Sequence, residues 1–304
     1  APLAILTHGF TSNRLHFNYL AEHLATHGYV VLVPEHIGSN EEYKEAFLRG
    51  ELSVDVSPIE FYSRPLDITF LLDELKNNSE FKGLVNWEQV GVLGHSFGGT
   101  TALAIAGAPI NIARISQICQ NNRPSLNISM LLQCRANYLP PVNSNLKDPR
   151  IKAVAVVNPM TSSILGPESM SKIAIPTMIL AGSKDIVTPF IEEQAHPFLW
   201  LTTENKYLGV MVGGNHSSTS ADEGSENFPG ILKGSHSELG RSYLKAMSLA
   251  FFETHLRDRS DYKPLLSSTY AKTISNQQLP LYLVKSLTSK QLNQAYGSTP
   301  PTPP

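Results

Sequence analysis

Short apolar runs alternate with amphipathic stretches along most of the chain. The run at 3–7 precedes a helical pattern at 17–27, and the next run, at 29–33, is apolar at every position. Later apolar runs and helical patterns follow the same rhythm, namely runs at 89–93, 152–157, 177–181 and 207–212, with helices at 65–76, 100–108 and 237–257. This alternation predicts an α/β fold, a mostly parallel central sheet flanked by helices. The run at 29–33 predicts a central strand, because both of its faces are apolar.

Two stretches depart from this alternation. Residues 109–150 are longer than a crossover to the next strand requires, and they contain the helix-like segment NISMLLQCRA. We interpret them as a cap-like insertion over the functional edge of the sheet, with a surface excursion as the alternative. Residues 291–304 end in GSTPPTPP and predict a Pro-rich, disordered tail. Residues 1–290 are expected to form one catalytic domain.

Composition limits the range of partners. The chain has 24 basic and 26 acidic residues, a formal charge of −2, which gives no electrostatic reason to expect nucleic acid. No apolar run reaches the roughly 18 residues that span a bilayer, so we expect no transmembrane segment. The first strand begins with neither a Met nor a signal peptide before it, and we expect a mature or truncated chain. The pattern does not indicate an oligomeric state.

Both cysteines, Cys119 and Cys134, lie within 109–150. They do not form a CxxC pair, so they do not indicate a metal site. A disulfide between them would stiffen the insertion and would indicate an oxidising compartment, with the chain secreted or periplasmic. Two buried free thiols are the alternative.

A candidate nucleophile follows the run at 89–93. Gly94-His95-Ser96-Phe97-Gly98 matches G-x-S-x-G and leads into a helix of small residues, the setting of a nucleophile elbow. Such a turn strains the backbone of the serine, and a Cβ two residues to either side would collide, so glycine is required at 94 and 98. The alternative is a Gly-rich turn with a bystander serine.

A candidate acid and a candidate base follow two later strands. Asp185 comes after the run at 177–181, and His216 follows the run at 207–212 in the sequence GGNHS. The carboxyl ends of parallel strands share one edge of a sheet, so these side chains should approach Ser96. A serine hydroxyl needs a base to take its proton, and a carboxylate fixes the tautomer of that base. The order serine, aspartate, histidine is the one that nucleophile elbows carry.

Other residues of these types are poorer candidates. His236 lies at the entry to a predicted helix, and His196 lies inside a segment that connects two strands. Asp148 precedes a strand, at the wrong end of the sheet. His23 and His27 are spaced to share one helix face, but no third ligand is near in sequence, so solvated polarity is the better interpretation.

Two backbone amides are candidates for an oxyanion hole. Phe97 follows the nucleophile at the amino end of a helix, where the dipole favours negative charge. Phe10 lies in the loop His8-Gly9-Phe10-Thr11 after the first strand, and the second donor of such sites comes from this loop.

Four motifs together carry a family resemblance: THGFTSN, GHSFGG, AGSKDIVTP and GGNHSS. They resemble the α/β-hydrolase superfamily, and within it the branch of plasma-type platelet-activating-factor acetylhydrolases, dienelactone hydrolases and polyester hydrolases, over about residues 3–255. The resemblance implies a catalytic triad of Ser96, Asp185 and His216, with Phe10 and Phe97 as oxyanion donors. The chain departs from the family in lacking antiparallel strands before the first motif. It also lacks the cysteine nucleophile of true dienelactone hydrolases.

The resemblance implies a serine hydrolase of carboxylic esters, acting on a small-molecule or lipid ester with a short acyl group. The expected reaction passes through an acyl-enzyme and needs no metal or organic cofactor. An amidase, a thioesterase or a cofactor-free peroxidase could use the same site. A non-catalytic binding module on a hydrolase scaffold is an alternative from another class.

Overall fold

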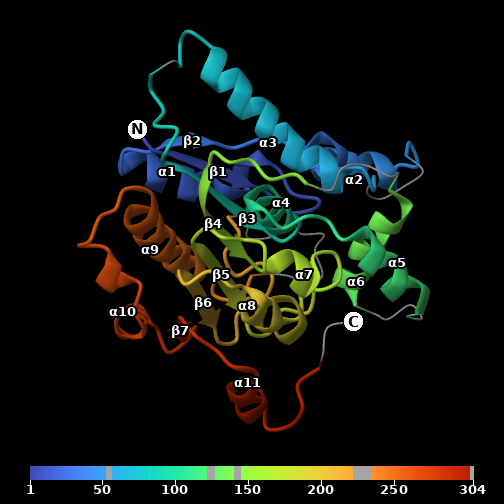
Figure 1. Ribbon diagram of the computed structural model, residues 1–304, viewed down its shortest axis with the longest axis vertical. Helices are drawn as coiled ribbons and strands as arrows, with labels where there is room; N and C mark the ends of the chain where they lie inside the picture. The colour runs from blue at the N-terminus through green and yellow to red at the C-terminus, as the bar shows by residue number, and fades with distance from the viewer. Residues whose placement is uncertain (53–56, 82, 122–126, 140–144, 222–233, 302–304) are drawn as a thin grey trace.

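The computed structural model describes residues 1–52, 57–81, 83–121, 127–139, 145–221 and 234–301. Within these residues a seven-stranded sheet has the order β2-β1-β3-β4-β5-β6-β7, and helices lie on both of its sides (Figure 1). The strands are β1 (Leu3–Thr7), β2 (Val30–Leu32), β3 (Val90–His95), β4 (Ile151–Val157), β5 (Thr177–Gly182), β6 (Lys206–Met211) and β7 (Leu281–Val284). All neighbours pair in parallel except β6 and β7, which are antiparallel. The predicted mostly parallel α/β fold is confirmed.

Helices and short turns of helix connect the strands. The α-helices are α1 (Asn18–Thr26), α2 (Glu41–Leu48), α3 (Glu60–Asn77), α4 (Phe97–Ala106), α5 (Ile112–Asn121), α6 (Ile128–Cys134), α7 (Gly166–Met170), α8 (His196–Trp200), α9 (Ser237–Leu256), α10 (Ser268–Ile274) and α11 (Ser289–Tyr296). The shorter pieces are η1 (Arg14–Phe17), η2 (Ile37–Ser39), η3 (Arg135–Tyr138), the π-helical η4 (Ile191–Ala195) and η6 (Lys263–Leu265). No helix among the described residues is both long and apolar enough to cross a membrane.

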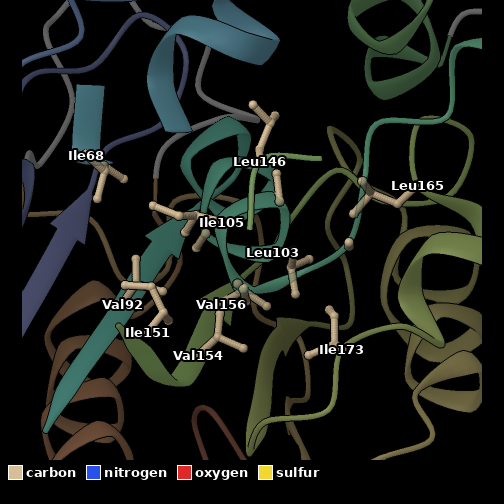
Figure 2. Close-up of a cluster of buried hydrophobic side chains, with 14 of the residues drawn as sticks. Ile68, Val92, Leu103, Ile105, Leu146, Ile151, Val154, Val156, Leu165 and Ile173 are labelled. Atoms are coloured by element: carbon tan, nitrogen blue, oxygen red, sulfur yellow. The ribbon is translucent and has the colours of Figure 1, made fainter. Parts of the chain in front are cut away.

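Each side of the sheet has its own hydrophobic core. In β1, Leu3 and Ile5 face the core that α3 and α4 cover, while Ala4 and Leu6 face the core under α1 and α9. Figure 2 shows the first of these cores, where Val92, Val154 and other strand residues pack against Leu103 and Ile105 of α4. Alternate burial of strand residues on both faces follows from the two-residue period of a strand. It explains why the strands were visible as continuous apolar runs.

The strand predicted at 29–33 is not central. β2 covers Val30–Leu32 and pairs with β1 alone, as an edge strand. Its side chains still pack on both faces, with Val30 against one core and Val31 against the other. The run is therefore apolar throughout because both faces of the strand are covered. The pattern does not show whether a strand pairs with one neighbour or with two.

The helix predicted from Pro65 begins earlier, at Glu60. The amides of Tyr62 and Ser63 both bond to the carbonyl of Ile59, and Pro65 lies inside the helix. A proline here removes one backbone bond, because only its own amide is missing. The earlier start adds Glu60 and Arg64 to the helix, and both side chains are buried. Arg64 donates to the His8 carbonyl after β1, whereas Glu60 accepts from the Ser39 hydroxyl in η2.

The tail predicted to be disordered at 291–304 contains helix α11 as far as Tyr296, so the prediction is wrong for that part. Thr288 and Gln291 cap this helix reciprocally, a signal that the Pro-rich composition obscured. The carbonyl of Pro301 lies 3.0 Å from His196 Nε2, and residues 302–304 lie outside the described residues. The antiparallel strand β7, alternately buried and exposed, was not predicted.

The insertion at 109–150 contains α5, α6 and η3, with 122–126 and 140–144 outside the described residues. A disulfide joins Cys119 of α5 to Cys134 of α6, which settles the alternative left open by the sequence. Gln133 of α6 accepts hydrogen bonds from the amides of Ser163 and Ile164, just after β4. These bonds fasten the insertion to the segment that follows β4, and its role as a cap stays a prediction.

Candidate active site

Ser96 occupies a strained turn between β3 and α4. Its backbone angles are φ 54° and ψ −121°, a conformation that a non-glycine residue adopts only when its surroundings enforce it. A Cβ on Gly94 would collide with the carbonyl of Gly98, and a Cβ on Gly98 would collide with the carbonyl of Thr7. The two glycines of the motif are therefore required by the close approach of α4 to β3 and β1, as the sequence predicted.

Asp185 and His216 lie within hydrogen-bond distance of each other. Asp185 follows β5 and His216 follows β6, and Asp185 Oδ2 lies 2.7 Å from His216 Nδ1. The carboxylate is fully buried, while the imidazole is 13% exposed. A carboxylate accepts the proton on Nδ1, which leaves Nε2 as the basic nitrogen of the ring. The pair therefore has the arrangement of a base oriented by an acid.

The second oxygen of Asp185 shapes its own loop. Oδ1 accepts hydrogen bonds from the amides of Val187 at 2.8 Å and Thr188 at 2.9 Å. The Thr188 hydroxyl lies 2.7 Å from Oδ2, beside the imidazole. Asp185 therefore caps its own turn through Oδ1 and contacts His216 through Oδ2.

Two side chains hold the backbone of the His216 loop against the elbow. His95, the residue before Ser96, places Nε2 2.9 Å from the carbonyl of His216, and the two rings are 4.7 Å apart. Asn158, at the end of β4, donates through Nδ2 to the same carbonyl at 3.2 Å. Its Oδ1 accepts from the Gly182 amide at 2.8 Å. The serine and histidine segments therefore meet at one edge of the sheet.

The contacts of His95, Asn158 and Thr188 were not predicted from the sequence. His95 was visible as a variable position of the motif, and Asn158 directly follows an apolar strand, where its left-handed backbone (φ 45°) favours asparagine. These positions in the sequence do not indicate which loop the side chain of His95 or of Asn158 contacts.

Buried histidines surround the candidate base but are poor bases themselves. Burial holds the pKa of His95 well below its usual value, and the neighbouring His216 and His16 lower it further. His16 stacks on His95 with ring centres 5.1 Å apart, and burial, followed by His216, lowers the pKa of His16 to about 4. Both rings are neutral at neutral pH. Nε2–H of His95 can then donate steadily to the carbonyl of His216.

The two predicted oxyanion donors belong to segments that adjoin Ser96. Phe97 is the first residue of α4, so its amide has no partner within the helix. Phe10 follows Gly9, whose Cα packs on the elbow: a Cβ there would lie 3.2 Å from the Cβ of Ser96. No described residue accepts a hydrogen bond from the Phe10 amide. Both amides remain available to a ligand beside Ser96.

In the described part of the chain, the competing candidates form no hydrogen bond or ion pair with Asp185 or His216. His236 precedes α9 in a left-handed conformation, His196 begins α8, and Asp148 is paired with Arg150 before β4. The rings of His23 in α1 and of His27, the residue after this helix, have centres 4.5 Å apart. Among the described residues, no group of three or more histidine, cysteine or acidic side chains is arranged to hold a metal ion.

Comparison with known proteins agrees with the fold. Residues 2–139 match a family model described as alpha/beta hydrolase fold. The chain is also 34% identical over 103 residues to a protein of Bacillus subtilis (strain 168) named "Putative esterase YitV"; the match covers 34% of this chain and 38% of that protein. These matches do not single out the acetylhydrolase branch within the superfamily. The sheet topology agrees with the alpha/beta hydrolase fold that this family model describes, and the model matches slightly less than half of the chain.

Proposed function

We propose that this protein is a serine hydrolase of carboxylic esters, with Ser96 as nucleophile, His216 as base and Asp185 as the orienting acid. The observation that carries the proposal is the 2.7 Å contact between Asp185 Oδ2 and His216 Nδ1, held against the strained turn at Ser96. A serine in a strained turn and an imidazole oriented by a carboxylate are the groups that acyl transfer requires.

The reaction we propose has two halves. Ser96 Oγ attacks the ester carbonyl carbon while His216 Nε2 takes the hydroxyl proton. The resulting oxyanion accepts hydrogen bonds from the amides of Phe10 and Phe97. Its collapse breaks the bond to the alkoxy oxygen, and His216 returns the proton so that an alcohol leaves. Water then attacks the acyl-enzyme with His216 as base again, releasing the acid and restoring Ser96.

Two observations favour an ester over other acyl compounds. The relative from Bacillus subtilis, which is similar to this chain over 103 residues, is named as an esterase. The four motifs resemble hydrolases of acetylated lipids and polyesters. We therefore propose a short-chain acyl ester, including lipid esters, as the substrate class.

The test combines turnover with covalent labelling. A series of p-nitrophenyl esters from acetate to palmitate should be hydrolysed, with the highest kcat/KM at short chains. Ser96→Ala should lower kcat by roughly 10⁴- to 10⁶-fold. Ser248, a buried serine on α9 whose hydroxyl bonds to the Leu244 carbonyl, offers a matched control, and Ser248→Ala should keep wild-type turnover.

A fluorophosphonate should label the wild-type protein at Ser96, as located by peptide mass spectrometry. Matched amide and thioester substrates run beside the esters define the bond that is cleaved. A faster thioester or amide would correct the substrate class and leave the site intact. Absence of label at Ser96, or undiminished turnover in Ser96→Ala, would refute the proposal and favour a binding module.

A further inference from the structure

A charged side chain lies completely buried beneath the loop that follows β1. Arg64 of α3 has no exposed surface, and its guanidinium donates from Nη1 to the carbonyl of His8 at 2.7 Å. Nη2 lies 3.4 Å from the carbonyl of Gly9. Burying a charge is costly unless the group is paired and hydrogen-bonded, so its place under two loop carbonyls calls for a physical reason.

The Gly9 carbonyl and the Phe10 amide belong to one peptide unit. In a trans peptide the C=O and N–H bonds point in opposite directions, so a donor that holds the oxygen also fixes where the N–H points. Arg64 and the ring of His8, whose Nδ1 is 2.8 Å from the same oxygen, hold the Gly9 carbonyl on the inner side of the loop. The Phe10 N–H is thereby turned away from Arg64.

The tautomer of His8 supports this arrangement. Its Nε2 accepts a hydrogen bond from the His36 amide at 3.1 Å, so the ring proton resides on Nδ1 and can be donated to Gly9. Burial, followed by the nearby charge of Arg64, lowers the pKa of His8 to about 2. The ring therefore stays neutral, with its donor and acceptor fixed, throughout the working range of pH.

The same guanidinium reaches the other half of the oxyanion hole. The guanidinium carbon of Arg64 lies 4.4 Å from the centre of the Phe97 ring, a cation–π contact with the residue that supplies the second amide. Phe61 packs on that ring edge-on at 4.7 Å. One side chain thus contacts both segments that carry the predicted donors.

Arg64 is held in place from its other side. Nε donates to the Ser39 hydroxyl at 2.8 Å, and that hydroxyl lies 2.6 Å from Glu60 Oε2. The Ser39 carbonyl accepts from the Thr11 amide at 2.9 Å, which fixes the loop just beyond Phe10. The buried carboxylate of Glu60, 3.7 Å from Arg64, supplies the counter-charge. The guanidinium is therefore oriented before any substrate binds.

We propose that Arg64 is a positioning residue of the oxyanion hole: it holds the Gly9–Phe10 peptide so that the Phe10 N–H faces the reacting carbonyl, and it fixes Phe97 through its ring. The inference rests on the proposed function, since it assigns a role in the same site. Arg64 touches no reacting atom. Its removal should therefore weaken stabilisation of the oxyanion and leave the binding of neutral ester little changed.

The informative variant is Arg64→Lys, which keeps a charge beside Glu60 but lacks the planar fork that spans Ser39 and the two carbonyls. The variant and wild type are compared per active site, after titration with a fluorophosphonate. We expect kcat for p-nitrophenyl acetate to fall roughly 10- to 100-fold, below the 100- to 1,000-fold cost of losing a donor outright. KM should stay within about threefold.

Inhibition by a trifluoromethyl ketone distinguishes a positioning role from a merely structural one, because a structural role would leave the Ki of the ketone unchanged. Ser96 adds to its carbonyl to give a hemiketal whose oxyanion occupies the hole, so its Ki should rise by the same factor as kcat falls. If Arg64→Lys does not fold, Arg64→Gln combined with Glu60→Gln removes both buried charges together and undergoes the same measurements. Arg150→Lys, which alters an ion pair on the far side of α3 with Asp73, is the matched control and should keep wild-type constants.

The outcomes separate this inference from the proposed function. If the wild-type protein is labelled at Ser96 but the Arg64 variants keep the wild-type kcat, the positioning role of Arg64 is overturned and the proposed function stands. A lower kcat with an unchanged Ki for the ketone would also overturn it, because the loss would then not involve the oxyanion. Absence of label in the wild-type protein would overturn both.

Discussion

Replacing Asp185 by asparagine tests the orientation of the candidate base. In the structure Oδ1 accepts from the amides of Val187 and Thr188, so the retained oxygen of an asparagine should keep this position and preserve the loop. The new NH₂ group then takes the place of Oδ2, 2.7 Å from His216 Nδ1. An amide NH₂ can only donate, which forces Nδ1 to accept and moves the ring proton to Nε2.

The ring then presents a proton to Ser96 where a lone pair is needed. Loss of the correct tautomer at an intact triad costs about 10⁴-fold in turnover, equivalent to about 5.5 kcal/mol of transition-state stabilisation. We expect Asp185→Asn to lower kcat for p-nitrophenyl acetate by this order. The rate of fluorophosphonate labelling should fall in parallel. The midpoint of urea unfolding should change little, because the two loop amides keep their acceptor.

Asp148→Asn is the matched control. Asp148 is also buried and also accepts from a backbone amide two residues on, but it precedes β4, at the opposite end of that strand from the candidate site. Its substitution should cost stability through the pairing with Arg150 and leave kcat per folded molecule unchanged. Turnover within tenfold of wild type in Asp185→Asn would refute the assignment of Asp185 as the acid, whatever happened to stability.

Three further predictions concern stability. Cys119→Ser opens a disulfide with a sequence separation of 15, and the unfolding free energy in urea should fall by about 3 kcal/mol, as it should in reduced wild type. Glu193→Ala removes a buried carboxylate that accepts from the Thr161 amide at 2.7 Å and the Ser162 amide at 2.8 Å. It should cost about 3–5 kcal/mol in the same assay, and a loss below 1 kcal/mol would contradict this reasoning. Burial lowers the pKa of His16 in the folded state to about 4, from an ordinary value of 6.5. The contribution of the neutral ring to stability is therefore complete above pH 6.5 and is lost as the pH falls toward 4. The loss should reach about 3 kcal/mol, and urea titrations of His16→Asn should show a correspondingly shallower fall with acid.

The candidate triad could be predicted because each of its members directly follows an apolar strand. Once β3, β5 and β6 were visible as apolar runs, the parallel order brought Ser96, Asp185 and His216 to one edge. Local signals such as the glycines at 94 and 98 added a second constraint, since the turn geometry requires them. Neither inference needed knowledge of which helix packs where.

Arg64 and Asn158 could not be predicted, because their partners are set by tertiary packing. Arg64 lies on a helix whose first turn was not predicted, since Pro65 indicated a helix start rather than an interior position. Its bond to the His8 carbonyl spans 56 residues of sequence. The edge position of β2 could not be predicted for a related reason. An apolar run indicates which faces of a strand are covered, but it does not indicate which edges are paired.

The variable positions of the G-x-S-x-G motif link the nucleophile to its neighbours. His95 directs its ring toward the base loop and bonds to the His216 carbonyl, while Phe97 directs its ring into the helix layer and receives Arg64. The two neighbours of Ser96 thus connect the turn to two other segments: His95 to the loop of His216, and Phe97, through Arg64, to the loop after β1. Substitution of His95 or Phe97 should therefore displace the segment that its side chain contacts and leave the turn itself in place. The turn depends on the two glycines of the motif, which permit the close approach of α4. The alignment of the candidate site then depends on contacts that the motif's fixed residues do not make, which is why matching G-x-S-x-G alone identifies a turn and not an enzyme.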